Sequence, residues 1–388
     1  MNIPYGKQWI DEKDKKAVLD VIGSELIAQG PKVEEFEKEL CKTTGAKYCV
    51  VVSNGTAALH LATLALDIKK GSEGITTPNT FVASANCLIY NNIKPVLADI
   101  CPDTYNIDPV EIKKRITRKT KVIIPVHFAG QVADMEEIQQ IAKKHNLFVI
   151  EDAAHAIGSE YPDGGKVGNC KYSDMTTFSF HPVKTITTGE GGAITTNDNM
   201  LYKKLLLLRS HGITKNPKEF SQNPGSWFYE MQNLGFNYRL TDIQAALGIS
   251  QLKKLEKFIK FRKKIVKKYN QAFQDLSSLG NVVLPFEKTP NSSAFHLYVL
   301  QIDFRKIGQY GKSRKTVMNQ LAKIGIGTQV HYIPVHFQPY YKKHFHFKDG
   351  NFPKAENYYD QCLSLPLYPK MTDNEVNYVI DSVKKVLS

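Results

Sequence analysis

A single lysine, Lys184, lies between an aromatic, hydroxyl-rich run and a glycine-rich stretch in residues 178–192, FSFHPVKTITTGEGG. A primary amine can condense with a carbonyl group, so Lys184 could carry covalent chemistry. A strand that leads into a turn would explain the same letters without any chemistry. The lysine is therefore informative only together with other polar residues at the same end of the fold.

Two further segments place polar residues where predicted strands end. Asp152 follows LFVIE, and Gly55 follows CVVVSN at a point where Thr56 and Ala57 can begin a helix. Free N–H groups at a helix start can hold an anion such as a phosphate. Each feature also has a purely structural interpretation, because an aspartate or the run Ser-Asn-Gly-Thr can simply cap a helix.

These segments belong to a pattern in which short apolar strands alternate with helical stretches. Strands are predicted at residues 48–53, 74–78, 94–100, 121–126, 147–152, 172–180 and 191–196. Helices are predicted at 56–66, 81–91, 108–116 and 134–145. The alternation predicts an α/β fold with a mostly parallel seven-stranded sheet, whose ligands gather beyond the carboxyl ends of the strands.

The second part of the chain has a different pattern. A long helical segment is predicted from about Asp242 to Leu276, and segments 313–325, 326–332 and 372–387 suggest a two-layer α+β module. A chain of 388 residues is too long for one compact core. We therefore predict a large domain over residues 1–250 and a small C-terminal domain over residues 251–388.

Composition narrows the class of protein. Hydrophobic residues make up 42% and charged residues 23%, no apolar run could span a bilayer, and the start lacks a signal-peptide core. We expect a cytoplasmic protein with no membrane partner. Six cysteines without a C-x-x-C pair indicate neither a zinc knuckle nor a disulfide framework.

The formal charge of +13 could indicate a nucleic-acid partner. However, the lysines of residues 251–269 alternate with apolar residues as on a solvated helix face, and no nucleic-acid signature accompanies them. We expect no nucleic acid, although a basic protein does favour small anionic ligands such as nucleotides.

Together, the three segments supply an anion cradle at Gly55 to Ala57, a carboxylate at Asp152 and an amine at Lys184. Pyridoxal 5'-phosphate (PLP) requires this set. It needs a lysine for a Schiff base, an acid partner for its pyridine nitrogen and amides for its phosphate. The combination therefore predicts PLP as the cofactor.

The sequence also resembles the DegT/DnrJ/EryC1/StrS sugar aminotransferases in seven blocks that occur in matching order. The blocks are SNGTAAL, TPNTFVASAN, EDAAHAIGSEY, FSFHPVKTITTGEGGAITT, RSHGI, LGFNYRLTDIQAALG and VHYIPVHFQPYY. The resemblance implies a fold type I PLP-dependent enzyme that acts as a homodimer on a nucleotide-linked keto sugar.

The resemblance implies roles for individual residues. Lys184 would form the Schiff base and move the proton, Asp152 would pair with the pyridine nitrogen, and His155 would lie near the ring and its phenolic oxygen. Phe81 would stack on the ring, and Asn237 would reach the phosphate from the partner subunit. The other phosphate contacts would be Gly55, Thr56, Ala57 and Ser179.

The segments that match the sugar site of the family supply further candidates. Substrate contacts are expected from Tyr5, Ala28, Gln29, Arg239, His331 and Tyr332. A metal site is the alternative interpretation of the histidines His331, His336, His344 and His346. Their spacing is irregular and no cysteine or carboxylate joins them, so we expect no metal.

Within the family, His155 and the motif HPVK at 181–184 resemble the aminotransferases of the pseudaminic acid pathway. That likeness implies transfer from L-glutamate to C4 of UDP-2-acetamido-2,6-dideoxy-β-L-arabino-hex-4-ulose. Another UDP- or dTDP-linked 3-keto or 4-keto sugar stays open as the substrate, as does a non-catalytic regulatory relative that binds PLP. A sugar dehydrase on the same fold would lack the lysine at position 184.

Overall fold

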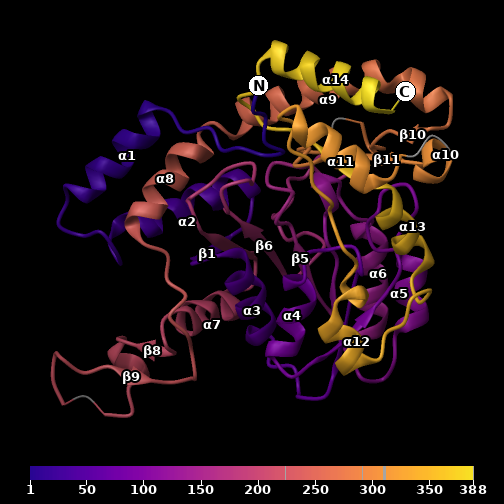
Figure 1. Ribbon diagram of the computed structural model, residues 1–388. Coiled ribbons are helices and arrows are strands. Elements are labelled where there is room, and N and C mark those ends of the chain that lie inside the picture. Colours follow the sequence, from indigo (N-terminus) through magenta and orange to yellow (C-terminus); the bar gives the residue numbers. More distant parts are fainter. Residues whose placement is uncertain (223, 291, 309–311, 388) are drawn as a thin grey trace.

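The computed structural model describes residues 1–222, 224–290, 292–308 and 312–387 (Figure 1). Its centre is a seven-stranded sheet with the order β1-β7-β6-β5-β4-β2-β3. The strands are β1 (Tyr48–Val52), β2 (Glu73–Thr76), β3 (Lys94–Leu97), β4 (Thr120–Ile124), β5 (Phe148–Asp152), β6 (Met175–Ser179) and β7 (Gly192–Thr196). β7 is antiparallel to both β1 and β6, and the other pairs are parallel. The predicted α/β fold with a mostly parallel sheet is confirmed.

Helices cover both faces of the sheet, which is why its strands are apolar on both sides. One face packs against α3 (Gly55–Ala65), α4 (Ala83–Tyr90) and α7 (Asn199–Arg209). The other face packs against α2 (Pro31–Thr44), α5 (Pro109–Arg115), α6 (Met135–His145) and α8 (Asp242–Leu252). In β1, Val50 and Val52 enter the first of these cores and Cys49 and Val51 the second, as the alternation along a strand requires.

Strand direction decides where the site can form. β1 and β6 are both antiparallel to β7, so they run in the same direction, and β5 is parallel to β6. The carboxyl ends of β1, β5 and β6 therefore lie along one edge of the sheet. That edge brings together the residues that follow Val52, the end of β5 at Asp152 and the end of β6 at Ser179.

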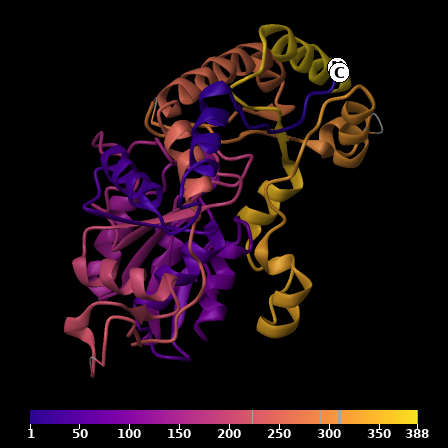
Figure 2. The ribbon, with the colours of Figure 1, turned by 90° about the vertical axis from the view of Figure 1, so that its left-hand side faces the viewer.

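A smaller layer lies above the sheet in Figure 1, where α9 and α14 run side by side (Figures 1 and 2). It holds α9 (Leu255–Ser278), α10 (Phe304–Gly308), α11 (Arg314–Lys323), α14 (Asp373–Leu387) and an antiparallel sheet of β10 (Val282–Val283), β11 (Tyr298–Ile302) and β12 (Cys362–Leu365). The side chain of Ile3 belongs to the same hydrophobic core. A domain boundary near residue 250 stays a prediction.

Three further helices and a hairpin lie outside these layers. They are α1 (Glu12–Ile22), α12 (Pro339–Phe345), α13 (Pro353–Gln361) and the pair β8 (Ile213–Thr214) and β9 (Glu230–Met231). The described residues between β8 and β9 project away from the body of the molecule in both ribbon views.

Two sequence-based expectations need correction. The single helix expected over 242–276 is two helices, because the chain turns at Lys253 and Lys254, and the Lys254 amine pairs with the buried carboxylate of Asp14. Residues 326–332 form no strand of the small sheet and make only isolated bridges, from Ile326 to Ile3 and from Gln329 to Ser364 in β12. Most lysine side chains of α9 are exposed, whereas Arg262 is buried and donates hydrogen bonds to backbone carbonyl groups.

Candidate active site

A cavity of about 700 Å³ lies at the carboxyl edge formed by β1, β5 and β6. Most of the predicted site residues line it: Tyr5, Gly55, Thr56, Ala57, Phe81, Asp152, His155, Ser179, Lys184, His331 and Tyr332. These residues come from both ends of the chain and from separate strands. The fold thus brings the predicted amine, carboxylate and helix start to one place.

The start of α3 has backbone N–H groups that can bind an anion. The cap residue Asn54 accepts the N–H of Ala57 at 2.8 Å, while the first N–H groups of any helix have no acceptor within the helix. A Cβ at Gly55 would lie 2.8 Å from the Cβ of Ser179, so only glycine allows the two segments to lie so close. Backbone N–H groups and a hydroxyl therefore share one corner of the cavity, as a bound phosphate requires.

The carboxylate of Asp152 is held in place by short hydrogen bonds. Its Oδ2 accepts from the Ser84 hydroxyl at 2.6 Å and its Oδ1 from the N–H of Ala154 at 3.1 Å. An ionised carboxylate can accept about four hydrogen bonds, so it can still accept one from a cationic N–H in the cavity. Sequence reasoning missed Ser84 as a site residue, although it lies inside the block TPNTFVASAN.

Lys184 lies in the irregular connection between β6 and β7, where its N–H donates to the carbonyl of His181 at 2.9 Å. Burial lowers the pKa of its amine to about 8, against the opposing attraction of the Asp152 carboxylate. Near neutral pH a useful fraction of the amine is therefore uncharged, which is the nucleophilic form.

A hydrogen-bonded pair, His155 and Tyr332, closes another side of the cavity. Nδ1 of His155 lies 3.2 Å from the N–H of Ala129 and must accept it, so Nε2 carries the proton and donates to the Tyr332 hydroxyl at 2.9 Å. Burial, together with the nearby positive Lys184, lowers the pKa of His155 far below its usual range, and burial raises the pKa of Tyr332. Both rings are neutral, and the Tyr332 hydroxyl keeps its own proton to donate.

Two more histidines line the same cavity. The ring of His296 lies 4.4 Å from that of His155, and Nδ1 of His331 lies 2.7 Å from the Ser364 hydroxyl. Burial lowers the pKa of His331 to about 3. Sequence reasoning missed His296, because nothing in the letters SAFHLYVL distinguishes it from a core residue.

The histidines considered for a metal site have separate partners. His336 contacts the Glu356 carboxylate, and His344 stacks on Tyr340. Within the described parts of the chain, no set of His, Cys, Asp and Glu side chains is arranged to hold a metal ion.

Four predicted residues lie outside this cavity in the single chain. Ala28 pairs with Thr241, Asn237 is exposed and pairs with Ser210, and Gln29 and Arg239 line a separate hollow of about 330 Å³. The roles predicted for these four residues stay predictions.

The residues present fit PLP. One cavity is lined by the Lys184 amine, whose pKa is lowered, by the hydrogen-bonded Asp152 carboxylate and by the start of α3 at Gly55. Phe81 lines the same cavity. The fold and the site together define a PLP-dependent enzyme of the aminotransferase fold.

Comparison with known proteins identifies the family. Residues 8–384 match the DegT/DnrJ/EryC1/StrS aminotransferase family, and the chain belongs to it. Members of this family bind PLP, and solved structural neighbours include PLP and pyridoxamine phosphate forms. The chain is therefore a PLP-dependent member of a family of sugar aminotransferases.

Individual relatives match over nearly their full length. SpsC of Bacillus subtilis (strain 168), a spore coat polysaccharide biosynthesis protein, is 42% identical over 99% of this chain and 97% of its own. The UDP-4-amino-4,6-dideoxy-N-acetyl-β-L-altrosamine transaminase of Campylobacter jejuni is 37% identical over 99% and 97%. The structure of Helicobacter pylori PseC, an aminotransferase of pseudoaminic acid biosynthesis, superposes with a TM-score of 0.90 at 34% identity, covering 100% and 99%. Among the described helices, none is long and apolar enough to cross a membrane.

Proposed function

We propose that the protein moves the amino group of L-glutamate to C4 of a UDP-linked 4-keto-6-deoxy sugar. The substrate would be UDP-2-acetamido-2,6-dideoxy-β-L-arabino-hex-4-ulose, the sugar aminated in pseudaminic acid biosynthesis. The observation that carries the proposal is the meeting of Lys184, Asp152 and the start of α3 in one cavity. The specific sugar is supported by the similarity to the C. jejuni altrosamine transaminase and to H. pylori PseC, an aminotransferase of pseudoaminic acid biosynthesis.

The similarity to SpsC keeps a second candidate in view. SpsC is more similar to this chain than the C. jejuni transaminase, at 42% against 37% identity, and its name places it in spore coat polysaccharide biosynthesis. A pocket can distinguish sugars by the position of one hydroxyl group, so amination of another UDP- or dTDP-linked 3-keto or 4-keto sugar is the alternative. A regulatory, non-catalytic protein that binds PLP is a further alternative, because Lys184 would hold the cofactor there as well.

In this proposal the chain's own residues divide the work. When bound, PLP supplies an aldehyde that takes the amino group and an electron-poor ring. Lys184 holds the cofactor through its amine and then carries a proton between cofactor and substrate carbons, for which a pKa of about 8 is suitable. Asp152, oriented by Ser84, holds a proton on the pyridine nitrogen and keeps the ring electron-withdrawing.

Tyr332 and His155 have a role in the same scheme. The Nε2–H group of His155 donates a hydrogen bond to the Tyr332 oxygen. The Tyr332 hydroxyl can therefore donate its own proton in a hydrogen bond to an acceptor in the cavity. We assign this acceptor to an oxygen of the cofactor or of the keto sugar. His331 and Tyr5, whose ring centroids are 5.6 Å apart, would border the sugar.

The proposal includes a homodimer with shared sites. Among the described residues that line the cavity, Lys184 is the single lysine or arginine, yet glutamate and a UDP-sugar are both anions. Asn237 and Arg239 lie outside it and would reach the cavity of the partner subunit. The projecting segment between β8 and β9 exposes apolar side chains, including Trp227 at 73% and Tyr229 at 58%, which a second copy would cover.

A cytoplasmic location is also part of the proposal. All of the cysteines are free thiols in the structure, which fits a reducing compartment.

A substrate panel tests the activity. The purified protein with PLP and L-glutamate would be offered UDP- and dTDP-linked 3-keto and 4-keto sugars, and release of 2-oxoglutarate and the mass of the amino sugar would be measured. We expect the UDP-linked 4-keto sugar named above to have the highest kcat/KM. Preference for another member of the panel would replace this substrate, and no transfer to any member would favour the regulatory alternative.

Subunit complementation tests the shared site. Lys184→Ala and Asn237→Ala subunits would be inactive or impaired alone, but mixed dimers would contain one site with both native residues. Recovery of transfer on mixing supports the proposal. Absence of recovery in mixtures shown by mass spectrometry to contain mixed dimers would place Asn237 in its own chain's site or outside any site.

A further inference from the structure

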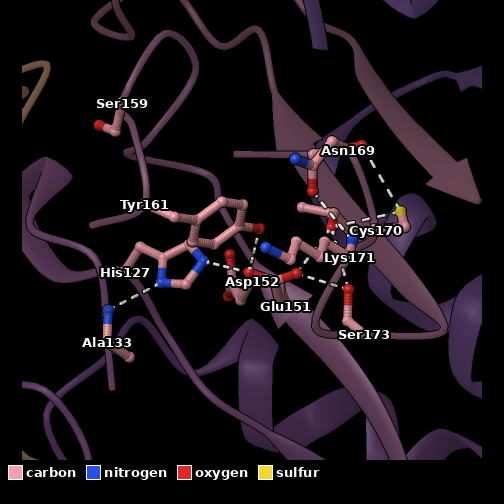
Figure 3. Close-up of polar contacts among 12 residues, drawn as sticks. His127, Ala133, Glu151, Asp152, Ser159, Tyr161, Asn169, Cys170, Lys171 and Ser173 are labelled. Atoms are coloured by element: carbon pink, nitrogen blue, oxygen red, sulfur yellow. Dashed lines mark hydrogen bonds and ion pairs between the residues drawn. The ribbon is translucent and has the colours of Figure 1, made fainter. Parts of the chain in front are cut away.

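A buried carboxylate lies on the face of β5 opposite to the cavity. Glu151 directly precedes Asp152, and because side chains alternate along a strand, the two carboxylates point to opposite faces. The Glu151 side chain is fully buried and accepts hydrogen bonds from His127 Nε2 at 2.7 Å, the Tyr161 hydroxyl at 2.7 Å, the Ser173 hydroxyl at 2.5 Å and Thr176 Oγ1 at 3.1 Å. Figure 3 shows His127, Tyr161 and Ser173 converging on it.

The charge state of this cluster follows from its geometry. Nδ1 of His127 accepts the N–H of Ala133 at 3.2 Å, so the ring proton is on Nε2 and is donated to Glu151. Burial alone would raise the pKa of Glu151, but hydrogen bonds from His127, Ser173 and Tyr161 outweigh it and lower this pKa. Glu151 is therefore an anion whose acceptor positions are filled by its own chain.

His127 connects this anion to the backbone of Asp152. Its own N–H donates to the carbonyl of Asp152 at 3.0 Å, and the N–H of Asp152 donates to the carbonyl of Pro125 at 2.8 Å. One residue thus holds Glu151 with its ring and Asp152 with its backbone. A shift of the His127 ring would move the strand end that carries the Asp152 carboxylate.

The same ring fixes the loop of residues 127–133. The bond from Ala133 to the His127 ring ties the end of the loop to its beginning. At the middle of the loop, Ala129 donates its N–H to His155 and accepts the N–H of His296 at 2.9 Å. Ala129 has a φ of 56°, a left-handed conformation that non-glycine residues adopt only where their surroundings enforce it.

We propose that Glu151 is a positioning residue for the cofactor site. Through the His127 ring it fixes the backbone of Asp152 and the loop 127–133, and through Ala129 it fixes the tautomer and orientation of His155. Glu151 itself touches neither cofactor nor substrate. The inference rests on the proposed roles of Asp152 and His155.

The test compares Glu151→Gln with the wild-type protein as the PLP-loaded full chain. A carboxamide removes the negative charge and replaces one acceptor oxygen by an NH2 group, so the partners on that side must reverse or lose their hydrogen bonds. Where the NH2 group faces the His127 ring, His127 can compensate only by turning an N–H toward the N–H of Ala133. By analogy with other residues that orient ligand-binding groups, we expect the Kd for PLP to rise about tenfold. The pH profile of the bound cofactor's visible absorption should also shift, because the Asp152 carboxylate is no longer held in register.

A matched control separates positioning from stability. Glu73 is another buried carboxylate, at the amino end of β2, and it accepts from the Thr117 hydroxyl at 2.6 Å. Glu73→Gln should lower the denaturation midpoint but leave the PLP affinity and the pH profile unchanged. If Glu151→Gln behaves in the same way, with lost stability and an unchanged profile, the proposal is overturned.

A second variant covers the case in which Glu151→Gln does not fold. His127→Asn has a side chain too short to reach Glu151, and we expect the same direction of change in Kd and in the pH profile. Unchanged values for this variant would also refute the proposal. The readouts are independent of the sugar: a wild-type protein that binds PLP but aminates no keto sugar would refute the proposed function and leave this inference intact.

Discussion

Glu151 and Asp152 are neighbours in the chain, but the two faces of β5 surround them differently. The Glu151 carboxylate accepts four hydrogen bonds from side chains of its own protein. The Asp152 carboxylate accepts bonds from Ser84 and Ala154 and still borders the cavity. The comparison shows how a fold builds a site. A polar group that holds the framework uses all its hydrogen-bonding positions within the chain, whereas a group beside the cavity has positions left for a ligand.

One histidine beside the cavity shows the same contrast with His127. His127, behind the sheet, has both ring nitrogens bonded to the chain, whereas Nδ1 of His296, beside the cavity, is buried without a hydrogen-bond partner in the structure. Buried polar atoms are rarely left unpaired without a functional reason. Each prediction below changes one side of this contrast and measures whether activity or stability responds.

Lys184→Ala should have the largest effect on activity. Without the amine, the cofactor cannot be attached and no residue carries the proton, so kcat should fall by about a thousandfold or more. The fold should persist, because Lys184 lies in a connection rather than in a core. Amino transfer is measured by 2-oxoglutarate release and folding by circular dichroism; retained transfer would refute the assignment of Lys184.

Asp152→Asn should have the next largest effect. The amide keeps the hydrogen bond with Ser84 possible but removes the negative charge that favours a protonated pyridine nitrogen. We expect kcat to fall roughly a hundredfold, in the range for loss of one electrostatic contact in an active site, with a smaller change in thermal stability. Unchanged turnover would mean that this carboxylate only caps the chain after β5.

Tyr332→Phe should have a moderate effect on the cavity side. The variant keeps the ring but removes the hydroxyl that receives the His155 proton and donates its own. Loss of one hydrogen bond corresponds to about a tenfold reduction in kcat/KM. The measurement is steady-state kinetics with the preferred sugar, and a variant with wild-type kcat/KM would show that Tyr332 donates to no reacting group.

The lowered pKa of Lys184 gives a pH dependence in the cofactor-free protein. An unfolded lysine keeps its proton up to its usual pKa of 10.5, whereas folded Lys184 releases it near 8. Between these values the unfolded state binds more protons, so folding stability rises with pH across this window. Relative to Lys184→Met, the urea midpoint of the wild type should rise from pH 8 to 10.5; a constant difference would show an ordinary pKa.

Tyr161→Phe should have the smallest effect on activity. It removes one of the donors to Glu151 but leaves His127 and the loop 127–133 in place. We expect the free energy of unfolding to fall by about 1 kcal/mol, with kcat and PLP affinity changed less than twofold. A large loss of PLP affinity would show that Tyr161, rather than His127, links Glu151 to the site.

Local patterns in the sequence predicted much of the site. The strand ends at Gly55 and Asp152, and the lysine before the glycines, were visible because each residue type has a specific use next to a strand end. All of the strands of the large sheet were located, because buried parallel strands are short apolar runs with clear boundaries. The helix break at Lys253 was missed, since a tertiary ion pair with Asp14 fixes it.

Other features depend on contacts between segments far apart in the chain. No local pattern indicates Ser84, Ala129 or His296. Ser84 matters through its hydrogen bond to Asp152, and the other two through their contacts with His155. The placement of Ala28, Gln29, Asn237 and Arg239 outside the cavity was equally invisible, since it depends on how the chain folds around the sheet.

The sequence by itself determined the α/β class and the cofactor, and it predicted the amine that would hold this cofactor. These predictions follow from residue types and from the alternation of short apolar strands with helical segments, which are local properties of the sequence. Only the tertiary structure decided which face of β5 receives each carboxylate, which nitrogen of His155 carries its proton and how low the pKa of Lys184 falls. These properties depend on burial and on hydrogen-bond partners, which exist only once distant segments are packed together.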